Sequence, residues 1–257
     1  MTATSSFKEA YISQIPALQL LKQLGFTYLP PAEALRLRGG RLRQVVLTDV
    51  LRAWLTANNT MRVKGQSHPF TPANIDLAIQ QLLDEPYDGL VRTNEKLYER
   101  LTLGSSLKQT IDGDSKSHTL RYIDWQQPER NVYHVTDEFV VERTRSLQTR
   151  RPDIICFING IPLIVIECKR PDQQTADKKN AVHAAISQML RNQQEDEIPQ
   201  LFVFAQILPA IHTNQARYGT TGMAPPAASA TFGPSGTKRV SKTTFQEAPS
   251  FLEGYSS

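Results

Sequence analysis

The sequence predicts an α/β fold, with a mixed central β-sheet flanked by helices and an α-helical N-terminal part. Apolar residues recur with the helical period of 3.6 through the first hundred residues. From about Leu120, β-branched and aromatic residues with a period of 2 replace this pattern. The two densest runs, 153–158 and 161–169, are apolar on both faces, which is typical of central strands covered by helices on each side.

Four helices are expected before residue 110. Proline near a helix start and glycine just past its end bound the first, between Pro16 and Gly25. Thr71 and Pro72 supply the cap and the first turn of the third. Apolar faces place the four helices at about 15–24, 47–55, 71–83 and 94–103. These helices predict a helical part, residues 1–110, that packs on an α/β core of residues 111–222.

The sheet is expected within residues 111–222. Strands are predicted at 133–136, 139–141, 153–158, 161–169 and 201–205, with a helix at about 176–193. Between the two apolar strands, Asn159-Gly160 is the strongest short hairpin signal. From Met223 onward Ala, Pro, Ser, Thr and Gly dominate, so residues 223–257 are predicted to be a low-complexity tail or truncated linker.

Composition limits the function classes. No run of 18 apolar residues exists, so a membrane span is excluded, and the N-terminus lacks a secretory signal pattern. We therefore expect a cytoplasmic protein. Cys156 and Cys168 lie inside apolar runs, which favours buried, reduced thiols. The net charge of +4 leans mildly toward polyanionic partners.

Charged side chains interrupt the two apolar strands. Asp153 begins one run, and Glu167 and Lys169 end the next. Burying unpaired charge there costs several kcal/mol, which a bound metal would offset. The two carboxylates, the backbone carbonyl of Cys168 and water are ligands that Mg²⁺ prefers, with phosphate oxygens completing the octahedron. Lys169 could then orient or deprotonate a water, or neutralise charge on the phosphate. This chemistry would hydrolyse a phosphodiester.

The carboxylates can share a metal only if they lie on one face of the sheet. A strict two-residue turn at Asn159-Gly160 would pair Asp153 with Ile166 and place Asp153 and Glu167 on opposite faces. A three-residue loop, 158–160, with glycine in the left-handed conformation and a bulge, pairs Asp153 with Val165 and leaves Glu167 diagonal to it. We therefore expect the three-residue loop.

Simpler interpretations exist for these residues. A charged pair at a strand end often marks a solvated edge, although both positions here adjoin strands too apolar to be edges. Arg150, Arg151 and Arg170 would place positive charge beside the site and could hold DNA phosphates. A polar loop between strands explains these arginines equally well.

The stretch 151–171, RPDIICFINGIPLIVIECKRP, resembles the PD-(D/E)xK nuclease motif of the restriction (R) subunits of type I restriction-modification systems. Residues 131–141, 198–204 and 216–220 agree, so the resemblance covers about residues 10–222. It implies a restriction-endonuclease-like fold, with Asp153 and Glu167 as metal ligands and Lys169 as the catalytic lysine. Family members often carry Gln-x-x-x-Tyr in the next helix. Here Gln188 matches as a further catalytic residue, whereas Asn192 stands in place of the tyrosine.

The resemblance implies a type I site-specific deoxyribonuclease domain that cuts double-stranded DNA with Mg²⁺, in a complex with methyltransferase and specificity subunits. Family R subunits continue into an ATPase motor. No phosphate loop is present in this sequence, since 233–238 lacks the required spacing, and no ATP site is expected in this chain. One alternative is a non-cleaving truncated R-subunit module that binds DNA or the methyltransferase complex. Another is a repair or junction-resolving nuclease of the same fold.

Overall fold

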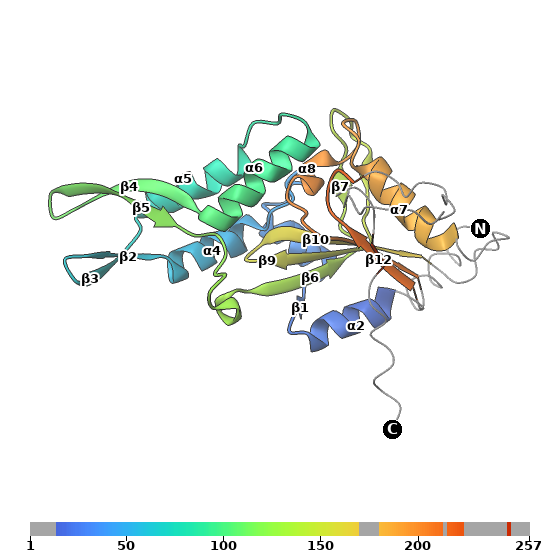
Figure 1. The fold of residues 1–257 in the computed structure, drawn as a ribbon, viewed down its shortest axis with the longest axis horizontal. Coiled ribbons are helices and arrows are strands. Elements are labelled where there is room, and N and C mark those ends of the chain that lie inside the picture. The colour runs from blue at the N-terminus through green and yellow to red at the C-terminus, as the bar shows by residue number, and fades with distance from the viewer. Residues whose placement is uncertain (1–13, 170–179, 213–214, 224–245, 248–257) are drawn as a thin grey trace, which may run out of the picture.

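A computed structural model describes residues 14–169, 180–212, 215–223 and 246–247. Its main feature is a seven-stranded sheet with the order β1-β6-β9-β10-β11-β12-β13 (Figure 1). The β1/β6 and β10/β11 pairs are parallel and the others antiparallel, which confirms the predicted mixed sheet. The strands are β1 (Thr27–Tyr28), β6 (Tyr133–Asp137), β9 (Ile154–Ile158), β10 (Ile161–Lys169), β11 (Leu208–His212), β12 (Gln215–Gly219) and β13 (Gln246–Glu247).

Helices cover both faces of this sheet. On one face lies α2 (Ile15–Gln23) (Figure 1), whose Leu18 and Leu21 pack against a cluster that includes Ile154 and Cys156 of β9. On the other face, the larger core cluster includes Ile155 of β9 and residues of α7. Burial on both sides explains why β9 and β10 are almost continuously apolar. The helices of the second face are α4 (Thr48–Asn58), α5 (Pro72–Leu83), α6 (Leu90–Leu103), α7 (Asn180–Asn192) and α8 (Pro199–Phe202).

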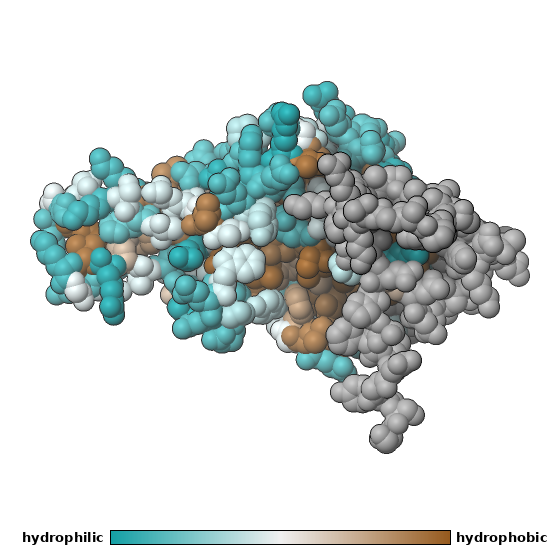
Figure 2. Space-filling model, in the orientation of Figure 1, coloured by the Kyte–Doolittle hydropathy of each residue, from teal (hydrophilic) through white to brown (hydrophobic). Residues whose placement is uncertain are grey.

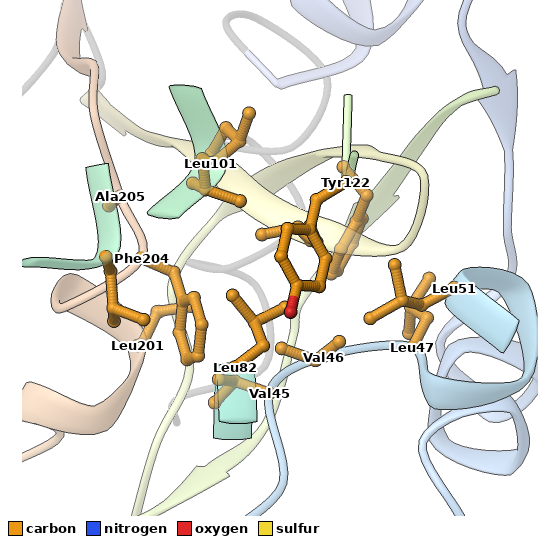
Figure 3. Close-up of a cluster of buried hydrophobic side chains, with 14 of the residues drawn as sticks. Val45, Val46, Leu47, Leu51, Leu82, Leu101, Tyr122, Leu201, Phe204 and Ala205 are labelled. Atoms are coloured by element: carbon orange, nitrogen blue, oxygen red, sulfur yellow. The ribbon is translucent and has the colours of Figure 1, made fainter. Parts of the chain in front are cut away.

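One apolar core joins the N-terminal helices to the sheet. Figure 3 shows Tyr122 in the middle of this cluster, with Leu82 of α5 next to its ring, Leu51 of α4 on one side and Leu201 of α8 farther away on the other. The Tyr122 hydroxyl donates a 2.7 Å hydrogen bond to the Ala78 carbonyl, so this buried phenol keeps a polar partner. The boundary predicted after residue 110 falls inside β4, and residues on both sides of it belong to this cluster.

The four N-terminal helices are confirmed, with Thr71 capping α5 through its Oγ1, which accepts from the Asn74 N–H at 3.3 Å. Two hairpins were not predicted: one lies between α4 and α5, and the other follows α6. They project together from the end of the molecule where α4 and α5 meet them (Figure 1). The hairpins are β2 (Thr60–Val63) with β3 (Gln66–Pro69), and β4 (Ser105–Ile111) with β5 (Asp114–Leu120).

Two strand predictions are wrong in position. Residues 201–205 do not form a strand, because Pro199 begins the short helix α8 and the next strand, β11, starts at Leu208. Of residues 139–141, only Val141 is in a strand, as the first residue of β7 (Val141–Glu142), which pairs with β8 (Thr149–Arg150). The remaining short elements are α3 (Pro31–Leu37) and the 3₁₀ turn η2 (Pro128–Arg130).

Three further predictions concern the burial of the two cysteines, the absence of a membrane span and the C-terminal tail. Cys156 and Cys168 are free and buried, as predicted. No helix in the described ranges is both long and apolar enough to cross a bilayer. Most of the predicted tail, residues 223–257, lies outside the described residues, although Gln246 and Glu247 form β13.

Candidate active site

The turn between β9 and β10 is a two-residue turn, so the predicted three-residue loop is wrong. Ile158 pairs directly with Ile161, and Asn159 and Gly160 have φ of 52° and 85°. Two positive φ values at an Asn-Gly pair are typical of a type I′ hairpin turn. Gly160 is also required sterically, because a Cβ there would lie 2.5 Å from the Leu47 carbonyl oxygen.

The expected bulge exists, but it lies within β10. Pairing shifts between Pro162 and Ile164, so that Leu163 is the extra residue. Pro162 has no N–H to donate to β9. The carbonyl of Leu163, the extra residue, accepts a hydrogen bond from the Gln206 N–H at 2.8 Å, on the side of β10 away from β9. A proline in a central strand is tolerated at such an irregularity.

The bulge places the two carboxylates on the same face. Beyond it Ile154 pairs with Ile166, and one further step of this register puts Asp153 opposite Glu167. The prediction of a shared face therefore holds, although through a different irregularity and with the two residues opposite rather than diagonal. Asp153 Oδ2 accepts a 2.7 Å hydrogen bond from the Cys168 N–H, which fixes this carboxylate against β10.

The backbone of Asp153 is held from two other segments. Its carbonyl accepts a hydrogen bond from the Gln14 side chain at 3.1 Å and from the Glu138 N–H at 2.9 Å. Gln14 itself is buried at the start of α2. No local sequence pattern marks Gln14 or Glu138 as part of this site, because their contacts with Asp153 span long separations in the sequence.

Glu167 is a buried carboxyl group beside this aspartate. It is 1% exposed, and its Oε1 accepts a 3.1 Å hydrogen bond from Lys169 Nζ. Its Oε2 is buried and has no hydrogen-bond partner among the described residues. Burial raises the pKa of Glu167 to about 8. The Asp153 charge and a hydrogen bond from the protonated carboxyl group to Asp153 add to the rise, and Lys169 opposes it.

Lys169 connects the carboxylates to α7. Its Nζ donates to Gln188 Oε1 at 2.8 Å as well as to Glu167, so three of the four predicted catalytic side chains are in one hydrogen-bonded chain. The fourth, Asp153, is adjacent to Glu167. Asn192, at the position of the family's tyrosine, is buried one turn further along α7, and its Oδ1 has no partner in the described parts of the chain.

The residues present fit a small, hard cation. Within the described ranges no cluster of three or more His, Cys, Asp or Glu side chains exists, so the donors here are two carboxylates. Mg²⁺ commonly binds through one or two carboxylates and takes its other ligands from water and substrate phosphates. The unpartnered Glu167 Oε2 is the observation that favours such a ligand, because a buried carboxylate oxygen without a donor is costly.

The predicted DNA-contacting arginines have different surroundings. Arg150 is held by the buried carboxylate of Glu197, with a 2.6 Å bond from its Nη2, and Arg143 joins the same carboxylate at 3.2 Å. Arg151 is about half exposed and lies 3.4 Å from Glu138. Arg170 lies outside the described residues.

Known proteins with similar sequences are restriction enzyme subunits. A family model described as the type I restriction enzyme R protein N terminus matches residues 6–226. The chain is 30% identical over 208 residues to the type I restriction enzyme HindI endonuclease subunit of Haemophilus influenzae, covering 79% of this chain and 18% of that protein. It is 28% identical over 221 residues to a Methanocaldococcus jannaschii protein assigned as the MjaIXP endonuclease subunit, covering 84% and 20%.

The chain spans about a fifth of the length of these relatives. The family match, in contrast, extends over most of the chain and includes the bulged hairpin, α7 and every strand of the seven-stranded sheet except β13. This chain belongs to the family of type I restriction enzyme R protein N-terminal regions.

Proposed function

We propose that this chain is the DNA-cutting domain of a type I restriction endonuclease subunit and hydrolyses phosphodiesters of double-stranded DNA with Mg²⁺. The observation that supports this most strongly is the environment of Glu167. This buried carboxylate has a raised pKa and an unpartnered oxygen, and it lies opposite a second carboxylate. When ionised it has one cationic neighbour among the described residues, Lys169, and a metal cation would stabilise this form further.

Each site residue has a distinct role in the proposal. Asp153, Glu167 and the Cys168 carbonyl hold the metal, which when bound polarises the phosphate and its attacking water. Asp153 is oriented by the Cys168 N–H. Lys169 Nζ neutralises charge that develops on the phosphate or orients the water, and Gln188 holds this ammonium in place from α7.

DNA that approaches this end of the sheet would meet positively charged side chains. Arg151 is the most exposed of the described arginines near Asp153, and it is our candidate for a phosphate contact. Arg150 is engaged with Glu197, so its contribution is better explained as fixing the segment that leads into Asp153. The methyltransferase and specificity subunits implied by the family remain proposed partners.

A non-cleaving module that only binds DNA or partner subunits is the second candidate. The observation that favours it is Asn192, which replaces the tyrosine of the family motif and leaves a buried oxygen unpartnered within the described residues. The two candidates share the same fold and differ in whether the site can cut.

Nicking of supercoiled plasmid distinguishes them. The purified chain is incubated at low salt with Mg²⁺ or Mn²⁺, next to Asp153→Asn, Lys169→Ala and the surface control Lys22→Ala, with each fold checked by circular dichroism. We expect nicking by wild type and the control, and a loss of at least about a hundredfold in both site variants. Equal nicking by all four would overturn the proposal, and none from any, even with type I partner subunits added, would favour the binding module.

A further inference from the structure

The β4–β5 hairpin has one face of unusual composition. Its register pairs Ser106 with Thr119, Lys108 with Ser117, and Thr110 with Ser115. Because residues two apart along a strand share a face, these six side chains lie together on it. All six are exposed, and Thr110 Oγ1 donates to Ser115 Oγ at 3.1 Å across the strands. We call this set the hydroxyl face.

The opposite face of the hairpin attaches it to the fold. Leu107, Ile111 and Leu120 are buried in the main core. The Gln109 side chain accepts from the Thr71 N–H at 3.0 Å and donates to the Pro69 carbonyl at 3.1 Å. The hydroxyl face therefore has a fixed orientation away from the core.

The hydroxyl face matches the chemistry of a phosphate backbone. It contains five hydroxyls and one ammonium, no carboxylate and no large apolar side chain. Lys108 makes no ion pair among the described residues, in contrast with Lys116 on the other face, which pairs with Asp114 at 2.7 Å. Serine, threonine and lysine are among the usual donors to DNA phosphates, and a two-stranded ribbon is narrow enough to follow a groove.

Further positive charge lies on the neighbouring β2–β3 hairpin, which contacts the opposite face of β4–β5 through Gln109 and Pro69. The neighbouring β2–β3 hairpin exposes Arg62 and Lys64, for which no ion pair exists within the described ranges. Teal and white, hydrophilic to neutral, side chains cover most of this end of the molecule (Figure 2). A second protein domain bound through a dry interface would require more apolar surface than these strands present.

We propose that the hydroxyl face of β4–β5 binds the sugar-phosphate backbone of double-stranded DNA, away from the cutting site. The hairpins project from one end of the molecule, whereas α7 and its Gln188 lie toward the other (Figure 1). The duplex would thus be held at a second point that contributes affinity without contacting Lys169. This inference rests on the proposed function, because DNA is the substrate there.

Fluorescence anisotropy with a labelled duplex of about 30 base pairs tests this, using the whole chain in EDTA so that no cutting occurs. The variants are Lys108→Glu and Ser106→Glu on the hydroxyl face. Lys116→Glu is the matched control, with the same residue type and hairpin but the opposite face. We expect each face variant to weaken binding about five- to tenfold, and Lys108→Glu to reduce the salt slope by about one; the control should change affinity less than twofold.

Two results would overturn the inference: wild-type affinity in both face variants, or equal weakening by Lys116→Glu. Thermal melting of each variant shows whether the hairpin stays folded, and Lys108→Gln repeats the test with a milder change. A nicking assay of Lys169→Ala with Mg²⁺ separates this inference from the proposed function, because that variant is read by its cutting and the face variants are read by their affinity. If Lys169→Ala nicks normally but the face variants lose affinity, the nuclease proposal fails and the binding face remains.

Discussion

The two ends of the β9–β10 pair bury polar side chains in opposite ways. At the turn, Asn159 is fully buried and fully satisfied: its Oδ1 accepts from Val132, and its Nδ2 donates to Tyr122 and Asn131. At the other end Glu167 is equally buried, yet one of its oxygens has no partner among the described residues. Complete satisfaction indicates a structural role, whereas an incomplete set next to a second carboxylate indicates a place for a ligand.

The largest expected effect is on stability at the satisfied end. Asn159→Ala should lower the free energy of unfolding by about 3 kcal/mol or more, because it leaves buried partners such as the Val132 N–H without hydrogen bonds and loses a residue suited to positive φ. Urea denaturation measures this. Asn58→Ala, a half-buried asparagine on α4, is the control and should cost under about 1 kcal/mol. Equal losses in the two variants would remove the contrast between the ends.

The unsatisfied end should respond to pH instead. The pKa of Glu167 is raised from 4.5 to about 8, so the folded chain keeps this proton over a range where the unfolded chain has lost it. Without metal, the stability from this group is present below pH 4.5 and is lost as pH rises to 8. The free energy of unfolding is measured in EDTA at pH 5.5 and at pH 8.5. Between these two pH values it should fall further in wild type than in Glu167→Gln, by at least about 1.4 kcal/mol, which is equivalent to one pKa unit.

The same pH-dependent unfolding measurements on control variants test this account of Glu167. The exposed control Glu95→Gln on α6 should keep the wild-type slope. Added Mg²⁺ should stabilise wild type at pH 8.5 but not Glu167→Gln, because the cation favours the ionised carboxylate. Parallel pH profiles for wild type and Glu167→Gln would mean that this carboxyl group titrates normally.

A smaller effect is expected from Gln14, which holds the Asp153 carbonyl from α2. Gln14→Ala should lower the nicking rate at saturating DNA about fivefold and leave the affinity for DNA unchanged, because it shifts a metal ligand without contacting the substrate. Gln23→Ala, exposed at the end of α2, is the control. If Gln14→Ala instead changes affinity and leaves the maximal rate intact, Gln14 does not position the site.

Local patterns in the sequence predict much of this fold. The four N-terminal helices, the central strands and the shared face of Asp153 and Glu167 follow from apolar periodicity and from the chemistry of buried charge. The exact register does not follow, because it depends on how Pro162 interrupts pairing with β9 and on Leu163 bonding toward β11. A bulge moves the register by one residue wherever it falls, so its position must come from tertiary structure.

The missed elements have their own physical reasons. The β4–β5 hairpin has a weak apolar pattern, since its outer face is almost wholly serine and threonine, although Asp112-Gly113 is a hairpin signal. Residues 201–205 resemble a strand in composition but follow Pro199, which starts a helical turn. Long-range contacts to the site, such as Gln14 to Asp153 and Arg150 to Glu197, leave no trace in local sequence.

Metal binding tests the central claim, that the bulged hairpin brings two carboxylates together as a cation site. Calorimetric titration of the chain with Mn²⁺ at pH 7.5, without DNA, measures this independently of cutting. We expect one site in wild type and at least about tenfold weaker binding in both Asp153→Asn and Glu167→Gln, with Glu95→Gln unchanged. Wild-type Mn²⁺ affinity in both site variants would contradict the account.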